Sequence, residues 1–104
     1  MRLVKQRRLY ALVRKDLSVA QRAVQASHAI AEFLLRGPKT EWDNGTIVIL
    51  GVKDEGELRT WATWLEVKGT PYTAFREPDI GNQMTALATV DGGNVFHRLA
   101  LLEG

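Results

Sequence analysis

Five polar residues in the first third of the chain are spaced so that they could share one side of a helix and bind a ligand. Intervals of four, three, four and four residues separate Gln21, Gln25, His28, Glu32 and Arg36, which matches the helical repeat. Such a row could offer hydrogen-bond donors to a sugar or a phosphate. It is also typical of a solvated helix face, on which Glu32 pairs with its neighbours four residues away. Spacing alone leaves both interpretations open.

A second candidate for chemistry is the polar segment Phe75–Ala86, which follows a predicted strand and contains Pro78 and Gly81. Loops that a rigid scaffold holds in place often carry catalytic residues. The alternative is an ordinary connection between two strands, in which Asp79 makes a hydrogen bond within its own turn.

Strands and helices must position these residues, and the chain alternates between the two. Four short apolar or β-branched runs predict strands at Leu9–Arg14, Thr46–Val52, Pro71–Arg76 and Thr85–Val90. Two helical patterns separate the first three strands. The first helix runs from Ser18 as N-cap to Arg36, before Gly37-Pro38, and the second runs from near Asp54 to Gly69.

The apolar residues of the two predicted helices indicate which side packs on the sheet. In the first helix they are Val19, Ala23, Ala26, Ile30 and the pair Phe33/Leu34. In the second helix they are Leu58, Trp61, Ala62 and Leu65. Trp61 is therefore expected in the core, whereas Trp64 falls outside the stripe and is expected at the sheet edge or in a subunit contact.

The resulting order β-α-β-α-β-β predicts an α/β fold with right-handed crossovers and a mainly parallel sheet, whose last two strands are antiparallel. Parallel strands gather their carboxyl ends at one edge, where α/β proteins usually bind ligands. Three segments are expected at this edge: Arg14–Ser18, Lys53–Asp54 and Arg76–Asp79. The N-terminus of the first helix opens beside them and can receive an anion.

Length and composition narrow the class of protein. The 104 residues suit a single domain, and contents of 45% hydrophobic and 25% charged residues are those of a globular chain. There are no cysteines, which excludes disulfides, thiol catalysis and cysteine-rich zinc sites. The chain has no glycine-rich phosphate loop and no Gly-x-Ser-x-Gly elbow. We therefore predict no nucleotide cofactor, no bound metal and no serine-triad mechanism.

The distribution of charge is more informative than the formal net charge of +2. Six of the 14 basic residues precede the first acidic residue, Asp16, and these are Arg2, Lys5, Arg7, Arg8, Arg14 and Lys15. This segment could attract a polyanion, or it could be a solvated tail. No apolar run approaches the ~18 residues of a membrane span, and none suits a secretion signal. A cytoplasmic protein without membrane contact is expected.

The two polar segments, in this order, resemble the second family of peptidyl-tRNA hydrolases, the archaeal and eukaryotic type. Members typically have Arg-x-Asp-Leu after the first strand and Ala-x-Gln-x-Ser-His-Ala in the first helix, which read here as Arg14–Leu17 and Ala23–Ala29. The acidic start of the second helix at Asp54–Glu57 and a Gly-x-Pro-Tyr motif at Gly69–Tyr72 also match. The resemblance extends over residues 9–90.

The resemblance implies a three-layer α/β/α sandwich on a mixed, mostly parallel four-stranded sheet, as one domain over residues 1–104. The family hydrolyses the ester that joins a peptide to the terminal ribose of tRNA, and it uses no metal or other cofactor. By the match, Asp79 takes the place of the catalytic aspartate and Thr85 that of a threonine at the start of the last strand. Gln21 stands where the family has a lysine, for which Arg22 could substitute.

In the reaction that the resemblance implies, Asp79 activates a water molecule, and Thr85 holds that water or the ribose hydroxyl. Backbone N–H groups or Arg22 would stabilise the oxyanion. The side chains expected to contact the substrate, three of them as cations that bind tRNA phosphates, are Arg14, Lys15, Arg76, Gln25, His28 and Asn82.

Two other hypotheses remain. The missing lysine and a missing loop threonine favour a catalytically inactive module of the same fold that binds tRNA or a protein. The third hypothesis is a hydrolase of small acyl esters that uses the same Asp79. Peptidyl-tRNA is the partner that the first hypothesis expects, and the family's habit together with Trp64 suggests a homodimer. The family's long C-terminal helix is expected only over about Asn94–Leu101.

Overall fold

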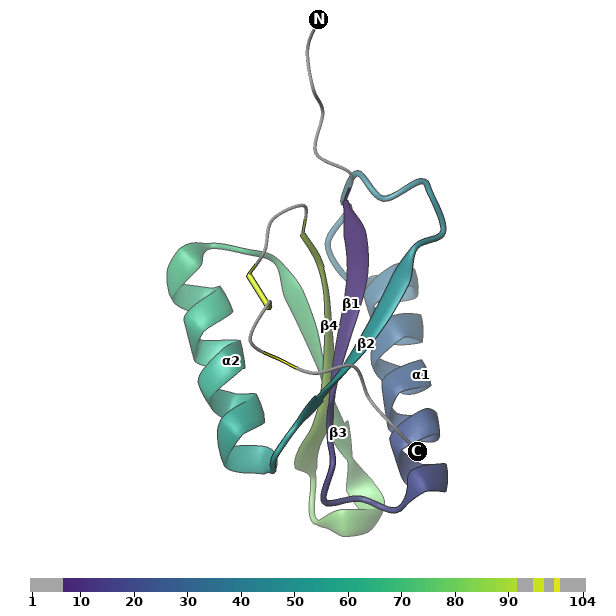
Figure 1. Ribbon diagram of the computed structural model, residues 1–104, viewed down its shortest axis with the longest axis vertical. Helices are drawn as coiled ribbons and strands as arrows, with labels where there is room; N and C mark the ends of the chain where they lie inside the picture. The colour runs from purple at the N-terminus through teal and green to yellow at the C-terminus, as the bar shows by residue number, and fades with distance from the viewer. Residues whose placement is uncertain (1–6, 92–94, 97–98, 100–104) are drawn as a thin grey trace, which may run out of the picture.

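Four strands form one mixed sheet in the order β2-β1-β4-β3 in the computed structural model, which describes residues 7–91, 95–96 and 99 (Figure 1). The strands are β1 (Arg8–Arg14), β2 (Ile47–Val52), β3 (Tyr72–Glu77) and β4 (Gln83–Asp91). β1 pairs with β2 in parallel, whereas β4 pairs antiparallel with both β1 and β3. The predicted α/β class and the antiparallel pairing of the last two strands are confirmed.

The sheet was predicted to be mainly parallel, and this holds for the direction of three strands but not for their pairing. β1, β2 and β3 run the same way, because β1 and β3 are both antiparallel to β4. However, β4 lies between β1 and β3, so only the β1–β2 pair is parallel. The helix expected over Asn94–Leu101 falls largely outside the described residues, as do Arg2 and Lys5.

Both helices begin and end where the capping residues predict. In α1 (Val19–Arg36), the Ser18 side chain accepts a hydrogen bond from the Gln21 amide, and the Gly37 amide donates to the Phe33 carbonyl. In α2 (Glu55–Lys68), Asp54 accepts from the Glu57 amide at 2.9 Å. Gly69 ends α2 with a φ of 73°, a left-handed conformation that glycine adopts without a steric penalty.

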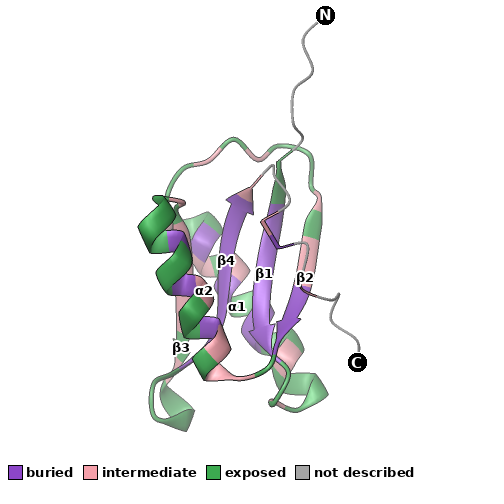
Figure 2. Cartoon of the chain, turned by 60° about the vertical axis from the view of Figure 1, so that its left-hand side comes forward, coloured by how far each residue is buried: buried purple, intermediate pink, exposed green. Residues whose placement is uncertain are grey.

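The helices pack on opposite faces of the sheet (Figure 1). One core cluster joins α1 to alternate residues of the two central strands: Ala26, Ala29, Phe33, Leu9, Ala11, Val13, Ala86, Ala88 and Val90. The other joins α2 to the remaining face: Leu58, Ala62, Leu65, Tyr10, Leu12, Leu50, Val52, Met84 and Leu87. Figure 2 shows the consequence, since β1 and β4 are buried over most of their length.

The buried face of α1 is rotated from the predicted one. Val19 and Leu34, expected in the core, are 57% and 53% exposed, and Ala23 is also exposed. The predicted Ala26 and Phe33 are buried and Ile30 packs against the core, which confirms that part of the face. Gln25 and Ala29 are buried as well. The helix has more apolar residues than one face needs, so periodicity alone did not separate the buried ones from the exposed ones.

A β-bulge interrupts the pairing of β3 and β4 near the start of β4. Phe75 pairs with Ala86 and Arg76 pairs with Met84, so Thr85 has no partner in β3. The extra residue breaks the alternation of side chains along the strand. Met84 and Leu87 both join the core under α2, while the hydroxyl of Thr85 bonds to Gln25 on α1. The bulge therefore turns Thr85 toward α1.

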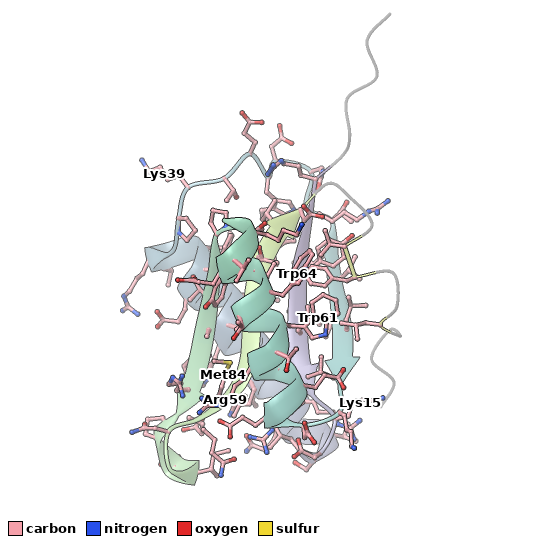
Figure 3. All side chains as sticks on the ribbon, turned by 90° about the vertical axis from the view of Figure 1, so that its left-hand side faces the viewer. Lys15, Lys39, Arg59, Trp61, Trp64 and Met84 are labelled. Carbon is pink, nitrogen blue, oxygen red and sulfur yellow. The ribbon has the colours of Figure 1, made fainter. Side chains whose placement is uncertain are left out.

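The two tryptophans of α2 differ in burial, and the prediction for Trp61 is confirmed. Trp61 packs against the core beneath α2, with its ring centroid 5.1 Å from that of Phe96. Trp64 is 37% exposed, lies edge-on to Trp61 and carries Lys68 above its ring (Figure 3). The core position of Trp61 is confirmed, and the contact role of Trp64 stays a prediction.

Candidate functional site

The carboxyl ends of β1, β2 and β3 meet at one edge of the sheet, at the lower end of the molecule in Figure 1. β4 begins at the same edge, immediately after the one-turn 3-10 helix η1 (Pro78–Ile80). The three segments that the sequence assigned to this edge are therefore gathered there. Two hydrogen-bonded clusters organise it, one around Arg14 and the other around Gln25.

Arg14 is the centre of the first cluster, and its guanidinium is occupied by protein groups. Its Nε and Nη2 donate to the two carboxylate oxygens of Asp16, each at 2.9 Å, in a two-pronged ion pair. Its Nη1 donates to Gln83 Oε1 at 2.8 Å and to the Met84 carbonyl at 3.3 Å. The hydrogen bond from Arg14 holds the pKa of Asp16 below its usual range and raises the pKa of Arg14.

Glu55 attaches the first turn of α2 to the same place. Its Oε2 accepts from the Met84 amide at 2.7 Å and lies 3.4 Å from the Arg59 guanidinium (Figure 3). The bond from the Met84 N–H is the main cause that lowers the pKa of Glu55. The start of β4 is thus held by side chains from β1 and α2. Arg14 is only 8% exposed, so the structure gives it a structural task in place of the expected phosphate contact.

Gln25 is the centre of the second cluster, which we call the Gln25 network and define as Gln21, Gln25, Glu77 and Thr85. Gln25 is 1% exposed, and all its side-chain polar atoms are paired. Its Oε1 accepts from the Thr85 hydroxyl at 2.8 Å. Its Nε2 donates to Glu77 Oε2 at 2.9 Å and to Gln21 Oε1 at 3.0 Å. Thr85 is completely buried, so its hydroxyl is not open to a substrate.

Glu77 connects this network to the turn that carries Asp79. Its second carboxylate oxygen, Oε1, accepts from the Asp79 amide at 3.2 Å, and its carbonyl accepts from the Asn82 amide at 3.0 Å. The bond from Gln25 is the first cause, and that from the Asp79 N–H the second, that lowers the pKa of Glu77. Gly81 and Asn82 complete the turn with φ values of 70° and 57°, in the left-handed region that glycine and asparagine tolerate best.

The Asp79 side chain is presented to solvent by this turn. It is exposed, and its carboxylate makes no hydrogen bond to any residue that the structure describes. The side-chain amide of Gln21 also has one group without a partner among the described residues. Because its Oε1 accepts from Gln25, its amide nitrogen faces away from that bond, and it donates to no described residue. Within the part of the chain that the structure describes, the Asp79 carboxylate beside the Gln25 network and the Gln21 amide nitrogen within it are therefore without a hydrogen-bond partner.

The remaining predicted residues take different positions. Arg22 folds back on the β1–α1 loop, where it donates to the carbonyls of Leu17 and Lys15 at 3.0 and 2.8 Å. His28 is exposed, with its ring centroid 4.5 Å from that of Phe75.

The other cations at this edge are open to solvent. Lys15 is exposed at the lower end of the molecule in Figure 3. Arg76 is also exposed, and its Nη1 donates to the Asn82 carbonyl at 3.3 Å.

Two open hollows lie along the junction of α2 and β3. One of about 340 Å³ reaches the site edge and is lined by Tyr72, Glu66 and Arg76, among others. The other, of about 570 Å³, lies at the far end of the sheet, where Gly69, Pro71 and Tyr72 line it. Burial and the neighbouring Glu66 carboxylate raise the pKa of Tyr72. Arg76 is the predicted site residue that lines the smaller hollow. Among the described residues, no three histidine or carboxylate side chains gather as ligands for a metal ion would.

Sequence reasoning missed three side chains that build the site, namely Asp16 and Glu55 as partners of the first cluster and Glu77 as the link to Asp79. Their types carried a signal, because each is a carboxylate at the carboxyl end of a strand or at the N-terminus of a helix. The partners of Glu55 and Glu77 lie 29 and 52 residues away in the chain, so local spacing could not identify them. Asp16 pairs with Arg14 only two residues away.

Comparisons with known proteins add information on the fold alone. No protein family matches this chain by its sequence pattern, and no curated protein matches it by sequence. Among solved structures, the chain is similar to a protein of unknown function, Atu0240 from Agrobacterium tumefaciens strain C58. The TM-score is 0.70 at 11% sequence identity, over 94% of this chain and 98% of the other. Neither helix in the described part of the chain is long and apolar enough to cross a membrane. These comparisons support a mixed α/β architecture and bear on nothing beyond the fold.

Proposed function

We propose that the protein hydrolyses the ester between the peptide and the terminal ribose of peptidyl-tRNA. The observation that carries this proposal is the hydrogen bond between the Thr85 hydroxyl and Gln25 Oε1, 2.8 Å long and 60 residues apart in the chain. The two residues belong to the two segments on which the resemblance rests. Their direct contact supports a single site built from both segments.

In the proposed reaction, Asp79 acts as general base. Its carboxylate takes a proton from a water molecule as the water oxygen bonds to the ester carbonyl carbon. The tetrahedral intermediate then expels the ribose oxygen, which takes up the proton that Asp79 holds. The products are a tRNA hydroxyl and a peptide carboxylic acid, which loses its proton to solvent, and Asp79 returns to its starting state. General base catalysis of this kind typically contributes ~10²–10⁴-fold in rate.

The other residues of the Gln25 network have supporting roles in this proposal. The free amide nitrogen of Gln21 is a neutral donor for the oxyanion, in the place where the related family has a lysine. Thr85 is a positioning residue, because its buried hydroxyl fixes the orientation of Gln25. Arg22 is not needed as an oxyanion donor, since its guanidinium already bonds to the β1–α1 loop.

The exposed cations Lys15 and Arg76 are the groups that we assign to tRNA phosphates, with His28 and Asn82 as further contacts beside them. The packing of α1 and α2 on opposite faces suits the three-layer sandwich of the related family. A substrate of this kind arises during translation, so a cytoplasmic location belongs to the same proposal. A homodimer also belongs to it. Trp64 is the contact that the sequence suggests, and the exposed apolar side of α1 is a second surface for a partner copy.

A second candidate is a tRNA- or protein-binding module without activity. It is favoured by one observation, that the lysine position holds a neutral Gln21 whose oxygen is already bonded to Gln25. The two candidates differ in what Asp79 does. In a binding module, replacing this carboxylate leaves function almost unchanged, whereas in a hydrolase it removes turnover.

Release of the acyl group from N-acetyl-aminoacyl-tRNA distinguishes the candidates. We expect release by the wild-type protein, a loss of about 10²-fold or more in Asp79→Asn, and a loss of about 10²-fold in Gln21→Ala. Asp43→Asn, an exposed carboxylate in the loop before β2, is the matched control and should keep the wild-type rate. Retained tRNA binding with no release at any protein concentration would favour the binding module.

A further inference from the structure

Glu77 is the residue at which the buried and exposed parts of the site meet. Each of its carboxylate oxygens has its own donor, since Oε2 accepts from Gln25 Nε2 and Oε1 accepts from the Asp79 amide. Its carbonyl closes the turn by accepting from the Asn82 amide. One side chain therefore joins α1 to η1.

The donor to Glu77 has a fixed orientation. Gln25 is buried, its Oε1 accepts from the Thr85 hydroxyl at 2.8 Å, and its Nε2 donates to Glu77. A carboxylate can only accept hydrogen bonds, so the Glu77 carboxylate requires this orientation of the amide. Burial leaves the Gln25 side chain no alternative partner in water. The position of the Glu77 carboxylate is thus set from within the core.

The same carboxylate caps the short helix that carries Asp79. Glu77 precedes Pro78, and its side chain satisfies the Asp79 N–H that would otherwise point into solvent. The Asp79 side chain has no partner of its own among the described residues. Its placement therefore depends on the backbone of η1, and that backbone is attached to α1 through Glu77.

We propose that Glu77 is the positioning residue of the site, whose carboxylate links buried Gln25 to the Asp79 amide and so sets where the Asp79 carboxylate stands. The expected effect on turnover rests on the proposed function, whereas the geometry of the turn does not. Glu77 itself needs no contact with substrate. A shift of Asp79 by about 1 Å can cost 10²-fold in rate, so the link has a measurable effect on kcat.

The decisive variants exchange the donor and the acceptor. In Glu77→Gln, the new amide can accept from either Gln25 or Asp79 with its oxygen, but its NH2 group opposes the other donor. In Gln25→Glu, two carboxylates face each other. The double variant Gln25→Glu/Glu77→Gln restores complementarity once the Gln21 amide turns over, since Glu at 25 then accepts from Thr85, from Gln21 and from the amide at 77, whose oxygen accepts from Asp79. Glu41→Gln, an exposed loop carboxylate, is the control.

We expect Glu77→Gln to lower kcat for N-acetyl-aminoacyl-tRNA about 10-fold with KM unchanged, and the double variant to recover to within about threefold of wild type. The Asp79 amide resonance, measured by NMR, should move in Glu77→Gln and return toward its wild-type position in the double variant. An unchanged kcat and an unmoved Asp79 resonance in a folded Glu77→Gln protein would overturn the inference. A double variant that folds but recovers neither the kcat nor the Asp79 resonance of wild type would also overturn the inference.

The NMR arm separates this inference from the proposed function. If the wild-type protein releases no acyl group, the proposed function fails, while the Asp79 resonance still reports whether Glu77 holds the turn. If turnover is present but Glu77→Gln leaves both readouts unchanged, the proposed function stands and the positioning role is wrong.

Discussion

At the scale of single residues, Gln25 is a polar side chain whose burial gives it a structural role. In the sequence it belongs to a polar helix stripe that solvent could cover, but in the structure it is one of the most buried side chains. Every polar atom of its amide is used, by Thr85, Glu77 and Gln21. A buried polar group with all its bonds made costs little, but removing one partner leaves the others unsatisfied.

Replacing either member of the buried pair should therefore destabilise the fold. We expect Gln25→Leu and Thr85→Val each to lower the free energy of unfolding by about 1–3 kcal/mol, because each leaves a buried polar group without its partner. Gln21→Ala, on the exposed end of the same network, should change it by no more than about 0.5 kcal/mol. Urea denaturation followed by circular dichroism measures all three. Equal effects of Gln21→Ala and Gln25→Leu would contradict the network as described.

At the scale of elements, the carboxyl end of β1, the start of β4 and the first turn of α2 are held together by two carboxylates. Asp16 forms an ion pair with Arg14, and Glu55 accepts from the Met84 amide. Both have a pKa below the usual range in the folded protein. The unfolded chain therefore binds more protons than the folded chain as the pH falls below about 4.5, and stability is lost in that range.

Asp16→Asn tests this link between charge and stability. At pH 7 the variant should be less stable than wild type, because the neutral amide loses the two-pronged ion pair with Arg14. Between pH 5 and pH 2 its stability should fall less steeply than that of wild type, because one titrating group with a lowered pKa is gone. Urea midpoints across this range measure the slope, with Asp43→Asn as control. A slope identical to wild type would show that the Arg14–Asp16 pair does not contribute.

The elements also show what a sequence can reveal. Ser18, Asp54 and Gly69 act within one turn of the chain, so caps and helix ends could be predicted from local residues. The burial of Gln25 and the bulge at Thr85 could not, because they bring together residues 60 positions apart in the chain. The family resemblance was enough to name Asp79 as a candidate. The hydrogen bonds that connect it through Glu77 to Gln25 are visible only in the structure.

At the scale of the whole molecule, the described surface offers a partner both exposed cations and exposed apolar side chains. Lys15 lies at the edge of the sheet with the candidate site, and Lys39 lies near the opposite end (Figure 3). The outer side of α1 instead exposes apolar residues, among them Val19, Leu34 and Leu35. The first surface suits a polyanion, and the second suits an apolar partner surface.

The two lysines form a matched pair for tRNA binding. Lys15→Ala should weaken binding and lower the slope of log K against log salt by about 1, because one phosphate contact is lost. Lys39→Ala removes the same charge far from the site and should change neither. Filter binding at several salt concentrations provides the measurement. Equal losses for both variants would indicate a response to net charge without a defined binding edge.

The apolar side of α1 can be tested through the oligomeric state. If a second copy covers this surface, sedimentation equilibrium should show a dimer of the wild-type protein, and Leu35→Glu should convert it to a monomer while preserving its circular dichroism. Asp43→Lys, in the exposed loop before β2, is the control and should stay dimeric. A wild-type monomer at all concentrations would remove the homodimer from the proposal.

The most direct test of the account is single-turnover hydrolysis of N-acetyl-aminoacyl-tRNA in ¹⁸O-labelled water, with tRNA binding measured on the same samples. We predict that the wild-type protein places the label in the carboxylate of the released N-acetyl amino acid. Asp79→Asn should bind tRNA equally well and release the acyl group about 10²-fold more slowly or worse. Equal release rates for the two proteins, at equal binding, would contradict the central role of Asp79.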